Sequence, residues 1–169
     1  VGKKAELLFT DGTTKVVTTE KDYSTGTNEI KDNRIVTYKV DADGVYTLRE
    51  VDTKKASYTD LDAALDMKND RASITITADN TNGKLNKSTV TANSATVFVV
   101  RDTVDTDDYT AYTGIKNAPT IKTTGATDDA KKAGVYLYCK SDNSKMVTVM
   151  FIIPGAKVDV SDESSDALY

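Results

Sequence analysis

The chain has 169 residues, enough for one domain with a sizeable core or for two small domains. It is 38% apolar, carries nine tyrosines but neither tryptophan nor histidine, and has a formal net charge of −4. Mild, scattered acidity argues against a nucleic-acid binder, which needs clustered Lys and Arg. The lack of histidine removes most nucleophile triads and zinc sites. The longest apolar run, Met146 to Ile153, is far shorter than the roughly 20 residues of a membrane-spanning helix, so we expect no membrane insertion.

Alternating apolar runs separated by short polar turns recur along the chain and predict β-hairpins. The expected hairpins, in chain order, turn at Asp11-Gly12, at Asp43-Gly44, at Asp102 to Asp108 and at Ser141 to Ser144. Between them, Ala72 to Ala78 alternates isoleucine with Ser and Thr and predicts a half-buried strand, and Thr89 to Thr91 predicts a short one.

Two runs, Val97 to Val100 and Val147 to Ile153, carry apolar residues on both faces. A strand loses its alternation when both faces are covered, so these runs predict inner strands. The residues expected in the core are Phe98, Val100, Val149, Phe151, Leu137 and Ile76.

Cys139 is the only cysteine, so the chain cannot form an internal disulfide. Its alternation with Val135 and Leu137 favours a small buried side chain over a free reactive thiol or an intermolecular link.

One segment, Ser57 to Met67, predicts a short helix, because Leu61, Ala64 and Leu65 recur at helical spacing after Thr59 or Asp60 as a cap. A single helical turn is expected near Gly114 to Asn117. The fold class is therefore all-β: an antiparallel barrel or sandwich built from successive hairpins, with one short helix.

We expect residues 1–153 to form the β-rich module, either as a single unit or as two small lobes that divide near 80–95. Residues 154–169 are Ser- and Asp-rich and predict an acidic linker and the start of a following segment. On this basis we expect the chain to be a piece of a longer, multidomain protein.

The stretch around Gly44 partly matches a calcium-binding loop. With Gly44 at position 6, Asp41, Asp43 and Glu50 fall at ligand positions 3, 5 and 12. Position 1, however, is Lys39, and strand-like flanks would hold Glu50 away from the loop. We therefore interpret the stretch as an acidic hairpin turn without metal.

Two further features have a functional and a structural interpretation. Asp105, Asp107 and Asp108 could collect a weakly bound cation, but a solvated hairpin apex is favoured. Tyr136 and Tyr138 share one strand face and could form a carbohydrate platform, although packing with the hydroxyls in water is favoured. No catalytic, cofactor-binding or metal-binding residue is predicted, and no cofactor.

Four stretches together carry a family resemblance: VTYKVDADGVYTL, TANSATVFVVRD, DDYTAYTGIKNAPTI and GVYLYCKSDNSKMVTVMFI. They resemble the β-rich region downstream of S-layer homology repeats in surface proteins of Gram-positive bacteria, over most of the span from Ile35 to Ile153. The resemblance implies an extracellular β module at the cell surface.

Taken together, these observations predict a non-catalytic structural module of a secreted cell-surface or S-layer-like protein. Its expected partners are neighbouring domains of the same chain or other surface-protein copies, with no nucleic acid. The alternative is an adhesin-like module that binds a cell-wall glycan, a host glycan or a protein. An enzyme is the least favoured class.

Overall fold

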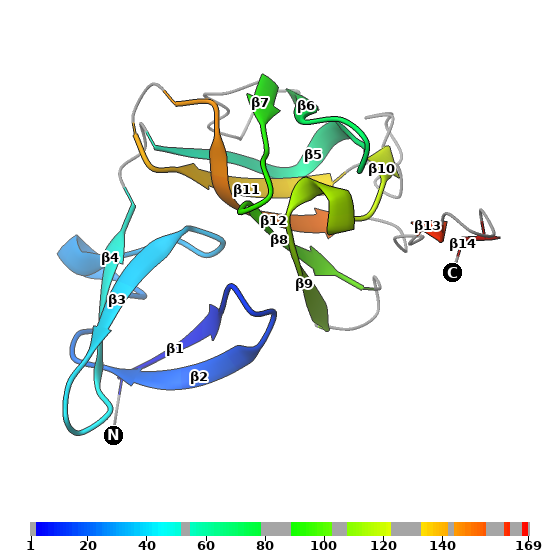
Figure 1. Cartoon of the computed structure of the whole chain (residues 1–169). Helices are drawn as coiled ribbons and strands as arrows, with labels where there is room; N and C mark the ends of the chain where they lie inside the picture. The colour runs from blue at the N-terminus through cyan, green and yellow to red at the C-terminus, as the bar shows by residue number, and fades with distance from the viewer. Residues whose placement is uncertain are drawn as a thin grey trace.

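The computed structural model describes residues 3–51, 55–78, 89–102, 108–122, 133–141, 144–154, 161–162 and 167–168. Within these residues the chain forms two main β-sheets and a small strand pair near the C-terminus (Figure 1). The helical elements among them are two short 3-10 turns, η1 (Gly26–Asn28) and η2 (Ile115–Asn117), the second of which was predicted. The all-β class built from hairpins is confirmed, and neither main sheet closes into a barrel within the described part of the chain.

The first sheet, here called the N-terminal sheet, has the strand order β1-β2-β4-β3 in the described residues. Its strands are β1 (Lys3–Leu8), β2 (Thr14–Thr19), β3 (Val36–Val40) and β4 (Tyr46–Glu50). β1–β2 and β3–β4 are antiparallel hairpins with the predicted turns, whereas β2 and β4 join the two hairpins in parallel. As a result β1 and β3, the two edge strands, run in the same direction.

The second sheet, here called the central sheet, has the order β7-β6-β5-β11-β12-β8-β9, with β10 paired to β5. Its strands are β5 (Ala56–Met67), β6 (Ser73–Ala78), β7 (Thr89–Thr91), β8 (Val97–Arg101), β9 (Tyr109–Thr113), β10 (Ile121–Lys122), β11 (Ala133–Cys139) and β12 (Val147–Pro154). β8 and β12 are inner strands, as predicted, and they pair in parallel. The small pair consists of β13 (Ser161–Asp162) and β14 (Ala167–Leu168), and the intervening residues of the expected acidic linker lie outside the described part.

The predicted helix at Ser57 to Met67 is wrong, because this segment lies in strand β5, which pairs with β6, β10 and β11. The same residues also alternate with a period of two. Leu65 and Met67 are fully buried, while Ala64 and Asp66, which alternate with them, are only partly buried. Burial of one face against the main core therefore outweighed a helical spacing that depended on three residues.

The two main sheets divide between Glu50 and Ala56. The range 80–95 considered for a division contains β7, which pairs with β6 in the same sheet.

The main core lies on one face of the central sheet and gathers side chains from most of its strands. Phe98, Val100, Leu137, Ile76 and Val149 are buried, as predicted. Phe151 is an exception. Its strand is an inner one, but its side chain is only partly buried and belongs to a second apolar cluster on the opposite face.

A β-bulge between Tyr138 and Cys139 explains how β12 serves both faces. The partner of Tyr138 is Val149 and that of Cys139 is Val147, so Thr148 is the extra residue. The bulge changes which face successive residues point to. Val147, Met150 and Ile152 consequently all reach the main core, while Phe151 and Ile153 join the second cluster. Cys139 is fully buried in the main core, which confirms the prediction for this residue.

The turn of the first hairpin touches the outer edge of β9 and connects the two sheets. Gly12 has φ +88°, and a Cβ at this position would lie 2.9 Å from the Tyr109 carbonyl oxygen and 3.3 Å from the Ala111 nitrogen. Gly44, in the second hairpin, has φ +79° with nothing within 4 Å of the equivalent position. Of these two hairpin glycines, Gly12 is therefore the one whose missing side chain allows a close approach as well as a left-handed turn.

We predict that Phe98→Ala lowers the free energy of unfolding by about 3–5 kcal/mol, because it opens a cavity in a fully buried site. Phe151→Ala should cost only about 1–2 kcal/mol, since that ring is partly exposed at the groove described below. Urea denaturation of both variants provides the measurement. Equal losses would show that the two faces of the sheet are packed alike, contrary to the structure.

The two glycines give a matched pair for the junction between the sheets. Gly44→Ala should lower the free energy of unfolding by about 1–2 kcal/mol, the cost of a side chain in a left-handed turn. Gly12→Ala should cost at least about 1 kcal/mol more, because its Cβ also pushes against the backbone of β9. Similar values for both variants in urea titrations would mean that the hairpin does not rest on β9.

Candidate functional site

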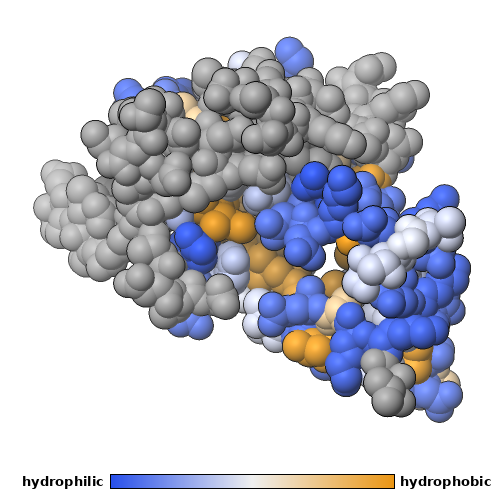
Figure 2. Space-filling view, turned by 180° about the vertical axis from the view of Figure 1, so that it is seen from behind, coloured by the Kyte–Doolittle hydropathy of each residue, from blue (hydrophilic) through white to orange (hydrophobic). Residues whose placement is uncertain are grey.

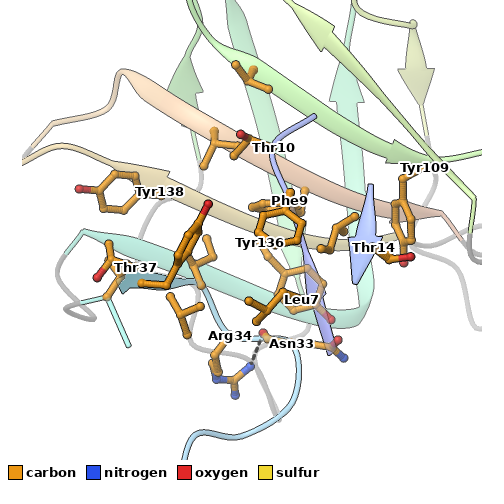
Figure 3. Close-up of a pocket in the computed structure, with 18 of the residues that line it drawn as sticks. Leu7, Phe9, Thr10, Thr14, Asn33, Arg34, Thr37, Tyr109, Tyr136 and Tyr138 are labelled. Atoms are coloured by element: carbon orange, nitrogen blue, oxygen red, sulfur yellow. Dashed lines mark hydrogen bonds between the residues drawn. The ribbon is translucent and has the colours of Figure 1, made fainter. Parts of the chain in front are cut away.

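A groove of about 710 Å³ lies between the two sheets. The N-terminal sheet contributes residues of β1 and of β3 with the segment just before it, and the central sheet contributes β11 and β12 (Figure 3). In the space-filling view a hollow is visible between the two lobes, with apolar side chains at its bottom (Figure 2). We call this the intersheet groove.

Aromatic side chains from distant parts of the sequence line the intersheet groove. They are Phe9, Tyr38, Tyr109, Tyr136, Tyr138 and Phe151. Phe9 and Tyr136 lie toward the middle of the groove, whereas Tyr138 and Tyr109 lie toward its two ends (Figure 3). The charged residues that line it are Glu6 and Arg34, so most of its wall is apolar or neutral.

The floor of the groove is formed by the face of β11 and β12 that is turned away from the main core. Alternation along β11 sends Val135, Leu137 and Cys139 into the main core and Tyr136 and Tyr138 to the groove, as the sequence predicted. Tyr136 is opposite Phe151 in the ladder and only 6% exposed, so it acts mainly as packing. Tyr138 is partly buried and offers more of its surface.

The opposite wall is held by contacts among aromatic rings. The Phe9 and Tyr38 rings meet edge to face with their centroids 5.7 Å apart, and Tyr38 also lies 5.4 Å from Tyr46. Such pairs stabilise by about 0.5–1.5 kcal/mol beyond area burial. Tyr38 nevertheless remains 48% exposed, and Val40 on the same strand is 46% exposed. The outer part of β3 therefore presents apolar surface to solvent.

Sequence reasoning identified Tyr136 and Tyr138 but missed Phe9, Tyr38 and Tyr109. These three come from different hairpins, and only the packing of the N-terminal sheet against the central sheet brings them to the same groove. One local signal in the sequence could have identified Tyr38 as a groove residue. Tyr38 alternates with Val36 and Val40, so these three apolar side chains share one face of their strand.

The acidic stretch around Gly44 forms the hairpin turn that the sequence predicted. The Asp41 carboxylate accepts hydrogen bonds from the amides of Asp43 and Val45, both at 2.9 Å, and the Gly44 amide donates to the Asp41 carbonyl oxygen. Glu50 is at the far end of β4, opposite Val36. The carboxylates of the partial calcium match are therefore not gathered at one point.

Asp11 plays the same part in the first hairpin. Its carboxylate accepts hydrogen bonds from the Thr13 hydroxyl at 2.6 Å and the Thr13 amide at 2.9 Å. These bonds hold the pKa of Asp11 below its ordinary value, the hydroxyl having the larger effect.

The third acidic turn is described only in part. Asp102 and Asp108 close it, with the Asp102 amide donating to the Asp108 carbonyl oxygen, whereas Asp105 and Asp107 lie outside the described residues. Within the part of the chain that the structure describes, no group of three or more acidic or cysteine side chains is arranged to hold a metal ion. The described residues likewise include no helix long and apolar enough to span a membrane.

Comparisons with protein-family models, with curated proteins and with solved structures found no match for this chain.

We predict that calcium does not stabilise the Asp41 turn. Calorimetric melts in millimolar calcium and in excess chelator should superimpose, because Asp41 already accepts two backbone amides and Lys39 replaces a ligand. A ligand at a hundred times its dissociation constant would add about 2.7 kcal/mol. A shift of that size in the native chain, absent from Asp41→Ala, would contradict this interpretation.

Proposed function

We propose that this chain is a non-catalytic module of an exported bacterial surface protein, and that it makes contacts with neighbouring polypeptides. The surface location is supported by the resemblance of VTYKVDADGVYTL and the three other stretches to regions that follow S-layer homology repeats. The partners would be adjoining domains of the same protein or other surface proteins.

One observation carries the contact role: β1 and β3 both end the N-terminal sheet without a further strand in the described residues. An open strand edge presents rows of unpaired N–H and C=O groups, which natural proteins normally shorten, cover or charge. In the central sheet the edges are protected in this way. β7 is only three residues long, with the Thr91 amide bonded to the Lys145 carbonyl, and the Gly12 turn lies against β9.

The absence of catalysis is part of the proposal and has two supports. The chain has no histidine for general base work. In addition, its turn carboxylates at Asp11 and Asp41 accept hydrogen bonds from their own turns, where they serve the hairpins.

The second candidate is an adhesin-like module that binds a glycan in the intersheet groove. It is favoured by the aromatic side chains there, because exposed tyrosine faces can stack against sugar rings. The nearly complete burial of Tyr136 argues against glycan binding, since that ring has little surface left for a ligand.

A glycan array combined with light scattering separates the two candidates. We expect the isolated chain to be monomeric and to show no selective glycan binding, because its exposed strand edges are suited to pairing with a strand of a different polypeptide. Tyr138→Ala and Tyr109→Ala test the groove, and Val16→Ala, at a residue 56% exposed on β2, is the control. Selective glycan binding that is lost in the groove variants but kept in Val16→Ala would favour the adhesin function instead.

A further inference from the structure

We propose that the N-terminal sheet is an incomplete barrel and that an acidic, extended segment of another polypeptide fills the gap between β1 and β3. The inserted segment would pair antiparallel with both strands and cover the intersheet groove. This inference deepens the proposed contact role and depends on it.

The first step concerns the curl of the sheet. In the ladder, Lys3, Thr19, Tyr46 and Val40 form one row across the four strands. Phe9 lies six residues beyond this row on β1, and Tyr38 lies two residues before it on β3. In a flat sheet their levels would differ by roughly 25 Å along the strand direction. Because the two rings are only 5.7 Å apart, the sheet coils along its diagonal and brings the end of β1 beside the middle of β3.

The second step concerns direction. β2 and β4 are parallel, and each pairs antiparallel with its own hairpin partner, so β1 and β3 run the same way. A single strand running the opposite way can therefore form antiparallel ladders with both at once. It would convert the open four-stranded sheet into a closed five-stranded one, which has no edges.

The third step concerns the free backbone groups. In an antiparallel pair, successive residues alternate between bonding the partner strand and facing away from it. The bonds from the Phe9 amide to the Thr13 carbonyl and from the Asp41 amide to the Val45 carbonyl fix the phase on each strand. The residues whose N–H and C=O face the gap are Lys4, Glu6 and Leu8 on β1, and Val36, Tyr38 and Val40 on β3. Because Phe9 lies beside Tyr38, the two sets are staggered along the gap, and a strand of about eight residues is needed to reach all six positions.

The fourth step concerns side chains. Glu6, Leu8, Val36 and Tyr38, four of these outward positions, also line the intersheet groove. A strand in the gap would place alternate side chains over its apolar floor and cover exposed surface of Tyr38 and Val40. The occupant should therefore carry apolar residues at alternate positions and no proline where an amide is needed.

The last step concerns the identity of the occupant. Exposed Lys4 and Lys39 lie on the two edge strands against the single Glu6, although the chain as a whole is acidic. Lys3 adds a third positive charge on β1, although its ammonium group already donates to the Glu20 carbonyl oxygen. These lysines favour an acidic segment and disfavour pairing with the same edge of a second copy. Moreover, every described strand of five or more residues already pairs within its own sheet, so the described residues of a second copy offer no such strand.

The test uses a phage-displayed random dodecapeptide library selected against the intact chain. We expect enriched peptides to be acidic, to alternate apolar residues and to lack proline in the pairing segment. Hydrogen exchange of the backbone amides at the six outward positions should slow when a synthetic copy of an enriched peptide binds. Light scattering should show a one-to-one complex of peptide and monomeric chain.

A double variant, Glu6→Pro with Val36→Pro, removes two amides that face the gap and leaves the bonds within the N-terminal sheet intact. It should bind the peptides at least about tenfold more weakly. The matched control, Glu6→Thr with Val36→Thr, changes the same side chains but keeps both amides, and should lose less than about threefold. Circular dichroism spectra that match that of the native chain will establish that the sheet is intact in both variants. If the proline variant unfolds, hydrogen exchange of the native chain with and without peptide tests strand insertion instead.

Strand insertion would be overturned if the proline and threonine variants bound the peptides equally well, or if exchange slowed only at other amides. A library that yields no binders, or dimerisation of the chain itself, would also overturn it. None of these results depends on the glycan array. Glycan binding that is selective and dependent on the groove tyrosines is the separate outcome that overturns the proposed function.

Discussion

The structure depends on the antiparallel ladder between β11 and β12, both of whose faces are apolar. One face holds Val135, Leu137 and Cys139 in the main core, while the other holds Tyr136 beside Phe151 and faces the N-terminal sheet. β5 pairs with the free side of β11, and β8 pairs with the free side of β12. The same ladder therefore organises the central sheet, the main core and the floor of the groove.

The bulge at Tyr138 and Cys139 makes this double use possible. A strand with strict alternation would place either Val147 or the pair Met150 and Ile152 in the main core, but not all three. Because Thr148 is extra, the ladder changes phase, and Phe151 is left for the opposite face. Phe151 alternates with Met150 and Ile152, so its side chain is on the face that lines the groove, and its half-burial does not result from an edge position.

The features that were predictable from the sequence are the local ones. Asp11-Gly12 and Asp43-Gly44 specify their hairpins through carboxylate-to-amide bonds over two to four residues, and alternation along β11 predicted which side of the sheet each residue faces. The parallel pairing of β8 with β12 joins segments about 50 residues apart, and no turn chemistry encodes it. The intersheet groove depends on such long-range pairings and on the curl of the N-terminal sheet, so its residues could not be assembled from the sequence. The error at Ser57 to Met67 has the opposite origin, since a local helical spacing was given more weight than an equally clear alternation.

The treatment of the strand edges gives the most direct clue to function. An edge that only needed protection could be short, as in β7, or covered, as in β9 by the Gly12 turn. β1 and β3 are longer than β7, end the N-terminal sheet in the described residues and expose Tyr38 and Val40 beside lysines. Lysine on an edge discourages indiscriminate pairing, and exposed apolar side chains favour pairing with a suitable strand. The combination suits a site that is selective for its partner.

The aromatic floor by itself does not distinguish a peptide from a glycan, because a tyrosine face can pack against either. The backbone groups at the walls of the groove do distinguish a peptide from a glycan. Six residues from two parallel edges present N–H and C=O groups at the two-residue spacing of an extended chain, whereas a sugar ring has no matching repeat. Binding energy from these groups becomes available only to a ligand that supplies a complementary backbone on both sides at once. The open edges, more than the tyrosines between them, therefore favour a polypeptide as the ligand of this surface.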